Sequence, residues 1–288
     1  MPLHQRRPSR APVDPVLVVH LEGWVDAGLA AATAVASLLE GGSPEPVAEY
    51  DGDELIDYRA RRPVVRLVDG VHGGLTWRVP RMLLTEDRDG RDILLLVGPE
   101  PDMRWHAFVA DVVELAGALG VRLLVGLGAF PAPVPHTRPI RIAATATDEA
   151  TAARVGFVAG NIDVPAGVQA ALEVAAGEAG IPAVGLWARV PHYVSGMPFP
   201  AGSAALVTAL ARVADLSLDT AALETAADAS RSRVDELIAG SEEHRAMVSQ
   251  LEASVDTSEG TPLDIGEVPS GDEIAAELQR FLRGESQA

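Results

Sequence analysis

The chain has 288 residues, of which 48% are hydrophobic and 4% aromatic, and its formal net charge at pH 7 is −18. This hydrophobic content supports a sizeable core, and the acidic charge argues against nucleic acid or an anionic membrane as a partner, since both recruit basic surfaces. The absence of cysteine excludes thiol chemistry and cysteine-ligated zinc, and because all 23 basic residues are arginine, lysine-dependent chemistry is excluded as well.

The first 14 residues are basic and rich in proline, and they predict a flexible N-terminal arm. The apolar run that follows them is too short for a signal peptide. No stretch of the sequence reaches the length of a membrane-spanning segment. We therefore expect a cytoplasmic protein that has no membrane partner.

From residue 15 onward, short apolar runs alternate with longer helical ones, which is typical of an α/β fold. The first unit is a strand at 16–21, followed by a glycine-containing turn and an alanine-rich helix closed by Gly41 and Gly42. Further strands are predicted at 47–50, 64–68, 75–79, 93–97, 121–127, 140–144 and 182–187. Further helices are predicted at 105–119, 166–179 and 202–213. Since continuous apolar strands are typically buried on both faces, residues 15–214 are predicted to form a domain around a mostly parallel or mixed central sheet.

The composition changes after residue 215. Residues 215–288 hold 17 Asp and Glu residues and 5 Arg residues, a net charge of −12, which leaves −6 for residues 1–214. Acidic, alanine-rich sequence at 219–256 predicts a pair of helices, so residues 215–260 are expected to form an acidic helical extension. Residues 261–288 are predicted as a linker and a last helix, because Ser270 and Glu273 form a capping box.

Four polar turns directly follow predicted strands. They read "EGWVDAG" from Glu22, "GPEPDMRWHAF" from Gly98, "FPAPVPHTRPI" from Phe130 and "RVPHYVSGMPFP" from Arg189. The carboxyl ends of parallel strands meet at one edge of a sheet, and ligands of open α/β folds bind there. We therefore expect the polar side chains of these turns to gather around one site. These side chains are Trp24, Asp26, Glu100, Arg104, His136, Arg138, His192 and Tyr193.

The two histidines and two of the carboxylates are candidates for acid–base catalysis. In that interpretation His136 or His192 is the general acid or base, and Asp26 or Glu100 is the carboxylate that orients or activates the histidine. Each has a structural alternative. Asp26 is equally suited to cap the alanine-rich helix, and histidines in ordered loops are usually held by structural hydrogen bonds.

Trp24, Arg104, Arg138 and Tyr193 are candidates for ligand binding, with the two arginines as anion clamps. Here too the alternatives are structural, because Arg104 lies one helical turn from Glu100 and can pair with it, and Trp24 can serve packing. No H-x-x-H or H-E-x-x-H spacing and no P-loop occurs, so we expect neither a metal nor a cofactor.

Six motifs in order make the sequence recognisable. They are "GWVDAG", "YDGDELIDYRARRP", "GPEPDMRW", "PAPVPHTRP", "GIPAVGLWARVPHYVSGMPFP" and "PSGDEIAAELQRFLR". Together, from about Val16 to Arg283, they resemble the proteasome assembly chaperone 2 family in its actinobacterial branch. The resemblance implies a three-layer α/β sandwich of the phosphorylase/hydrolase-like type and a homo-oligomer. It supplies no set of catalytic residues.

Two functions remain open at this point. The first is a non-enzymatic, oligomeric binding protein that resembles proteasome assembly chaperones. Its partners would be copies of itself, a basic protein surface that meets residues 215–288, or proteasome-related subunits. The alternative is a hydrolase or phosphorylase that acts on a small nucleoside-like or polar metabolite at the carboxyl edge of the sheet.

Overall fold

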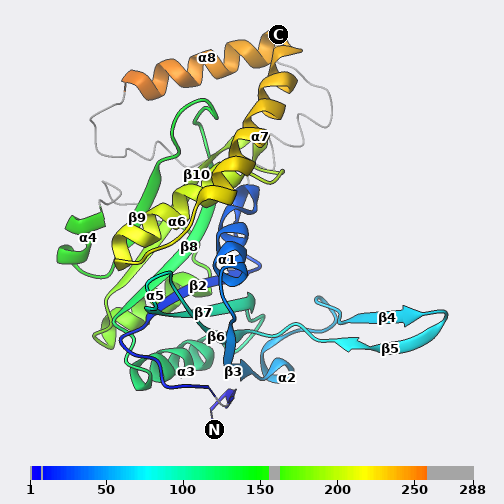
Figure 1. Ribbon diagram of the computed structural model, residues 1–288, viewed down its shortest axis with the longest axis vertical. Helices are drawn as coiled ribbons and strands as arrows, with labels where there is room; N and C mark the ends of the chain where they lie inside the picture. Colours follow the sequence, from blue (N-terminus) through cyan, green and yellow to red (C-terminus); the bar gives the residue numbers. More distant parts are fainter. Residues whose placement is uncertain (1, 8, 156–162, 258–288) are drawn as a thin grey trace.

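The protein is described here from a computed structural model, which describes residues 2–7, 9–155 and 163–257 (Figure 1). A large mixed sheet forms its centre, with helices on both faces, and this confirms the predicted three-layer α/β fold. The strands lie side by side in the order β1 (His4–Arg6), β3 (Glu45–Tyr50), β6 (Arg81–Glu86), β7 (Asp92–Pro99), β2 (Val16–Glu22), β8 (Leu123–Ala132), β10 (Ala183–Pro191) and β9 (Ile142–Ala146).

The four central strands β7, β2, β8 and β10 run parallel to one another. The strands outside this group, β1, β3 and β6 on one side and β9 on the other, pair antiparallel to their neighbours. The carboxyl ends of β2, β7, β8 and β10 therefore share one edge of the sheet. This is the edge at which the sequence predicts a site.

Alternation along the strands divides the core into two halves. On β2, Val16 and Val18 belong to the core on one face of the sheet, and Leu17 and Val19 belong to the core on the other. The first face, called the α1/α6 face, is covered by α1 (Ala30–Glu40) and α6 (Pro200–Ala214), and the second, the α3/α5 face, by α3 (Trp105–Ala118) and α5 (Val168–Glu178). The shorter elements are η1 (Ala27–Leu29), α2 (Gly52–Leu55), α4 (Glu149–Val155) and η2 (His192–Val194).

The predicted pair of acidic helices is present as α7 (Ala221–Ala239) and α8 (Glu242–Thr257). Helix α7 packs on α6, and α8 follows it at the end of the molecule farthest from the N-terminus (Figure 1). Leu223 and Val234 of α7 are buried in the core of the α1/α6 face. The predicted last helix, at 272–283, lies outside the described residues.

The segment predicted as an N-terminal arm contributes an edge strand to the sheet. Strand β1 pairs antiparallel with β3. Asp111 of α3 accepts the backbone N–H of Leu3 at 3.0 Å and contacts Nδ1 of His4 at 2.5 Å. Farther along, Arg10 forms an ion pair with Asp92 at the start of β7. These contacts attach β1 and Arg10 to the body of the protein.

Two strands lie apart from the large sheet. Strands β4 (Val64–Val68) and β5 (Val71–Thr76) form an antiparallel hairpin that projects from the side of the molecule (Figure 1). Every residue of both strands is exposed. Among the described residues, no helix is both long and apolar enough to cross a membrane.

Glu173 of α5 is a carboxylic acid buried over the sheet. It lies above β8, β10 and β9, where Gly126, Gly185 and Thr145 occupy paired positions. A Cβ atom at Gly126 or Gly185 would come within 2.3 and 2.8 Å of the Glu173 carboxylate oxygens, so a side chain at either position would displace this carboxylate. The Gln169 amide donates to Glu173 at 3.0 Å and the Thr145 hydroxyl at 3.4 Å. Burial nevertheless raises the pKa of Glu173 to about 7.

We expect Glu173→Gln to stabilise the protein at pH 8 and to change its stability little at pH 4. Because the pKa in the folded state exceeds the ordinary value of 4.5, the folded protein keeps a proton that the unfolded chain releases. The free energy of unfolding therefore falls as the pH rises from about 4.5 to about 7. The neutral amide removes this loss, which amounts to at most about 3 kcal/mol.

Urea unfolding of both proteins across this pH range measures the difference. Glu178→Gln, at the exposed end of the same helix, serves as the control and should show no such pH dependence. A stability difference between Glu173→Gln and the parent that does not grow with pH would contradict the prediction.

Candidate functional site

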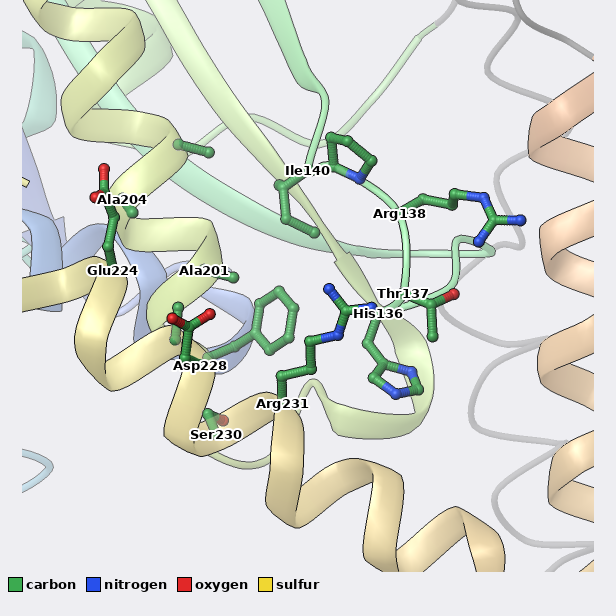
Figure 2. Close-up of a pocket in the computed structure, with 14 residues that line it drawn as sticks. His136, Thr137, Arg138, Ile140, Ala201, Ala204, Glu224, Asp228, Ser230 and Arg231 are labelled. Carbon is green, nitrogen blue, oxygen red and sulfur yellow. The ribbon is translucent and has the colours of Figure 1, made fainter.

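A cavity of about 490 Å³ lies beside the carboxyl edge of the sheet (Figure 2). One wall is the loop that follows β8, with His136, Thr137 and Arg138. The other walls are the first turns of α6 and the α7 side chains, among them Asp228 and Arg231. Arg231 extends from α7 toward Thr137 and His136 (Figure 2). The proline-rich loop after β8 thus forms one wall of this cavity.

His136 is held at both ring nitrogens. Its side chain is only 2% exposed, and its Nε2 lies 2.9 Å from a carboxylate oxygen of Asp235 on α7. Its Nδ1 lies 2.7 Å from the Tyr193 hydroxyl, and its backbone N–H donates to the same oxygen at 2.8 Å. Both ring nitrogens of His136 and the Tyr193 hydroxyl have hydrogen-bond partners when His136 Nε2–H donates to Asp235 and the Tyr193 hydroxyl donates to His136 Nδ1. His136 therefore joins the loop after β8, the turn after β10, and α7.

Tyr193 and His192 differ in their surroundings although they are neighbours in the turn η2. Burial raises the pKa of Tyr193, and the nearby carboxylates of Glu252 and Asp235 add to this effect, while the His136 N–H opposes it. The phenol is thus kept neutral, which suits a hydrogen-bonding role better than that of a base. His192 is exposed, and its ring packs edge-on against Tyr193 at a centroid distance of 5.3 Å.

Arg138 is paired with two carboxylates of α8. Its Nε and Nη2 donate to the two carboxylate oxygens of Asp256 at 2.8 and 2.7 Å, and its Nη1 donates to Glu252 at 3.1 Å. The neighbouring Thr137 hydroxyl also donates to Glu252. The guanidinium lowers the pKa of Asp256, as expected for a two-pronged pair. Arg138 fastens α8 to the loop, so it is not free to clamp a small anion.

Asp26 caps the helix that follows it. Its two carboxylate oxygens accept the backbone N–H groups of Ala31 and Ala32 at 2.9 and 3.0 Å. These amides belong to the first turn of α1, where intrahelical acceptors are lacking. His20 of β2 lies 3.8 Å from the Asp26 carboxylate. The structural alternative for Asp26 is therefore the one that the contacts support.

Glu100 plays a similar part for α5. It is buried, and its carboxylate accepts the backbone N–H of Val168, the first residue of that helix, at 2.6 Å. Trp24, which is 46% exposed, lies beside the same turn. A Cβ atom at Gly167 would fall 3.0 Å from Glu100 Oε1 and 3.1 Å from the Trp24 ring. Glu100 and Trp24 do meet, around the start of α5.

Arg104 does not pair with Glu100. It precedes α3 in a left-handed conformation with φ of 60°, and its guanidinium forms an ion pair with Glu54 of α2. The structural alternative of a Glu100–Arg104 pair therefore does not occur, because Arg104 pairs with the neighbouring helix α2 instead.

The predicted convergence thus occurs in two separate groups. His136, Tyr193 and Arg138 lie in one group, and Trp24 and Glu100 in another. The sequence reasoning missed the acidic partners Asp235, Glu252 and Asp256, which lie about 100 residues or more farther along the chain. The only sequence signal for them is the charge of the extension, which names no partner. Within the described ranges, no group of three or more possible ligands could hold a metal ion.

We expect Tyr193→Phe to lower the free energy of unfolding by about 1–3 kcal/mol. The change removes the hydroxyl that serves both His136 groups and leaves a buried N–H without its acceptor. Urea denaturation checks this value. His192→Ala is the matched control in the same turn and should change stability by less than about 0.5 kcal/mol, since its ring is exposed. Equal losses in the two variants would show that His136 does not depend on Tyr193.

Comparison with known proteins identifies the relatives of this chain. The sequence profile of the PAC2 family matches residues 20–238, whereas no curated protein matches the chain. A protein of unknown function from Corynebacterium glutamicum has a solved structure with a TM-score of 0.84 at 32% identity, and the match covers 90% of this chain and 98% of the other.

Two further solved structures carry family names. A proteasome-assembly chaperone homologue from Mycobacterium tuberculosis has a TM-score of 0.75 at 37% identity, with 81% of this chain and 99% of the other covered. A PAC2 family protein from Streptomyces avermitilis has a TM-score of 0.74 at 37% identity, with 82% and 100% covered. These findings confirm the resemblance carried by the six motifs: the chain belongs to the PAC2 family.

Proposed function

We propose that the protein is a non-enzymatic binding protein with a chaperone-like role, which associates with copies of itself and with proteasome-related subunits. The exposed hairpin β4–β5 is the observation that carries this proposal. Its large apolar side chains are 43–69% exposed, and Trp77 at its base is 49% exposed. The exposed apolar residues of the two strands are Val64, Val65, Leu67, Val68, Val71 and Leu75.

The exposed apolar side chains of this hairpin favour its burial against another protein chain. Successive residues of a strand point to opposite faces, so the consecutive pairs Val64–Val65 and Leu67–Val68 place apolar side chains on both faces. An isolated two-stranded hairpin is only marginally stable in water, and exposed strand edges invite pairing with another chain. Apolar surfaces of this kind mark protein–protein interaction sites.

Charge supports self-association. The hairpin and the segment before it carry Arg59, Arg62 and Arg66, none of which forms an ion pair with the described part of the chain. Helices α7 and α8, in contrast, expose Glu236 and Glu242, which also have no ion-pair partner there. Opposite charges on two distant surfaces of one chain favour contact between copies, and they make it sensitive to salt.

The use of the predicted catalytic side chains also supports a binding protein. Asp26 and Glu100 cap helices, His136 links α7 to two loops, and Arg138 holds α8. A proteasome-related partner is suggested by the relative from Mycobacterium tuberculosis that is called a proteasome-assembly chaperone homologue. That relative is 37% identical to this chain.

The double variant Val65→Asp/Leu67→Asp is expected to convert an oligomer into monomers and to abolish any effect on proteasome assembly. Sedimentation velocity reports the mass. The yield of assembled particles from purified proteasome subunits of the same organism, with and without the protein, reports the effect on assembly.

Val174→Asp is the control, because Val174 is an equally exposed valine, 59%, that lies on α5 away from the hairpin. It should leave both measurements unchanged. A parent protein that is monomeric would overturn self-association. Assembly that proceeds equally with and without the protein would overturn the chaperone role.

The alternative function, a hydrolase or phosphorylase for a small nucleoside-like or polar metabolite, rests on the cavity beside His136. Its volume of about 490 Å³ lies within the usual range of ligand pockets. Arg231, on its wall, makes no ion pair or hydrogen bond with the described residues. It is the group there that an anionic substrate would meet.

If this alternative holds, a nucleoside or sugar phosphate that fills the cavity should raise the melting temperature of the parent protein and not that of Arg231→Gln. Arg233→Gln, an exposed arginine of the same helix that does not line the cavity, should behave like the parent. A thermal shift that is equal in all three proteins would place the ligand elsewhere and remove the support for this enzyme.

A further inference from the structure

Two arginines lie opposite each other at the carboxyl edge of the sheet: Arg141 directly before β9, and Arg189 on the neighbouring strand β10. The Arg189 N–H donates to the carbonyl oxygen of Arg141 at 3.3 Å, one step beyond the register pairs Ala188–Ile142 and Trp187–Ala143. Residues directly opposite in an antiparallel pair project to the same face. Since Ala188 and Ile142 belong to the core of the α1/α6 face, both arginines are on the α3/α5 face. The cavity beside His136 is bordered by α6 and α7, on the other face.

Neither charge is compensated by the described part of the chain. Both residues are half-buried, and neither guanidinium forms an ion pair or a hydrogen bond there. Burial lowers the pKa of Arg189, and the charge of Arg141 lowers it further. Like charges directly opposite on adjacent strands destabilise a sheet, and an unpaired, partly buried charge adds a desolvation cost. This is unusual in a chain with 41 Asp and Glu residues, where carboxylates are plentiful.

The acidic group buried over the same strands cannot serve as the counter-charge. Glu173 lies over Gly126, Gly185 and Thr145. On β10, Gly185 precedes Arg189 by four residues, so Glu173 lies farther from the carboxyl edge than the two arginines do. Its oxygens already accept hydrogen bonds from Gln169 and Thr145. Its raised pKa, about 7, also leaves it mostly protonated below neutral pH. A negative charge for the arginines must come from outside this part of the fold.

Aromatic side chains share the face with the arginines. Phe130 of β8 is paired in register with Arg189, and Gly128 is paired with Trp187. The Trp187 ring covers Gly128 so closely that a Cβ atom there would fall 2.3 Å from the ring. Both aromatic residues thus lie on the strands that carry or adjoin Arg189, within one or two residues of it. Arginine and flat aromatic surfaces together are well suited to a planar or ring-bearing anion.

We propose that Arg141 and Arg189 bind an oxyanion, the phosphate or carboxylate group of a small molecule, on the α3/α5 face at the carboxyl edge of β10. The location agrees with the general rule that ligands of open α/β sheets bind beyond the carboxyl ends of the parallel strands. Two guanidinium groups offer a pair of donor forks for such a group. The ligand would replace the missing carboxylate and relieve the repulsion between the two arginines.

Inorganic phosphate and citrate, each titrated at constant ionic strength with sodium chloride, are the probes. The parent protein is expected to show a saturable rise in melting temperature and a saturable change in tryptophan fluorescence, which Trp187→Phe should abolish. The apparent affinity should fall by roughly tenfold or more in Arg141→Gln and in Arg189→Gln. Tighter binding of phosphate identifies a phosphate ligand, and tighter binding of citrate a carboxylate ligand; either supports the site.

Arg212→Gln is the control, because Arg212 is an exposed arginine of α6 on the opposite face of the sheet, and its response should equal that of the parent. In phosphate-free buffer Arg141→Gln and Arg189→Gln should be at least as stable as the parent, because each removes one of two repelling charges. A loss of stability in that buffer would show a structural role instead and overturn the proposal. So would the absence of a saturable response to both anions, or a response of the double variant Arg141→Gln/Arg189→Gln equal to that of the parent.

Discussion

The parallel pairing of β8 with β10 is the constraint on which the rest of the structure depends. It is nine residues long, from Ala183–Leu124 to Pro191–Ala132, and it continues to the ends of both strands. The sequence Val-Pro-His occurs at the end of each strand, at 134–136 after β8 and at 190–192 at the end of β10, so the two stretches lie side by side. This is why the Tyr193 hydroxyl, in the turn after β10, reaches both the backbone and the ring of His136, in the loop after β8.

The acidic extension acts first as a counter-charge within its own chain. Asp235 of α7 and Asp256 of α8 contact His136 and Arg138, which stand at the exit of β8. The helices are thereby held over a loop that already has little freedom, because its prolines restrict the backbone. A part of the extension is still open to other partners, since Glu236 and Glu242 remain exposed and unpaired within the described residues. The extension can thus be both a cover for the loop and a charged surface.

Local pattern was sufficient to predict most of the elements. Most strands and helices from 16 to 256 that the sequence indicates are present, because apolar runs and helical periodicity are properties of short segments. The strand predicted at 75–79 is wrong in position, because β5 spans Val71–Thr76. Strands β1 and β6 were missed. The first is a short edge strand with polar residues, and the second follows the hairpin without a clear turn signal. The first strand of the hairpin was predicted at its observed bounds and the second was predicted four residues too late. The separation of the hairpin from the central sheet could not be predicted, since strand pairing is a long-range property.

The chemistry of the edge could be predicted only in part, for the same reason. Strand topology brings the turns together, as expected, but the partner of each polar side chain depends on contacts between distant segments. Asp26 and Glu100 lie next to helix starts whose N–H groups need acceptors, and that demand exists in any α/β fold. Arg138 and Asp256 are 118 residues apart, and nothing in either motif points to the other.

The two faces of the edge are completed in different ways. On the α1/α6 face the carboxylates of Glu252 and Asp256 neutralise the charge of Arg138, and these ion pairs hold α8 against the loop after β8. On the α3/α5 face the described residues leave Arg141 beside Arg189 with no carboxylate that pairs with either. An unpaired, half-buried charge costs desolvation energy, and a bound anion would offset that cost. We therefore infer that the ion pairs of Arg138 stabilise the fold, whereas Arg141 and Arg189 bind an anion that can exchange with solvent.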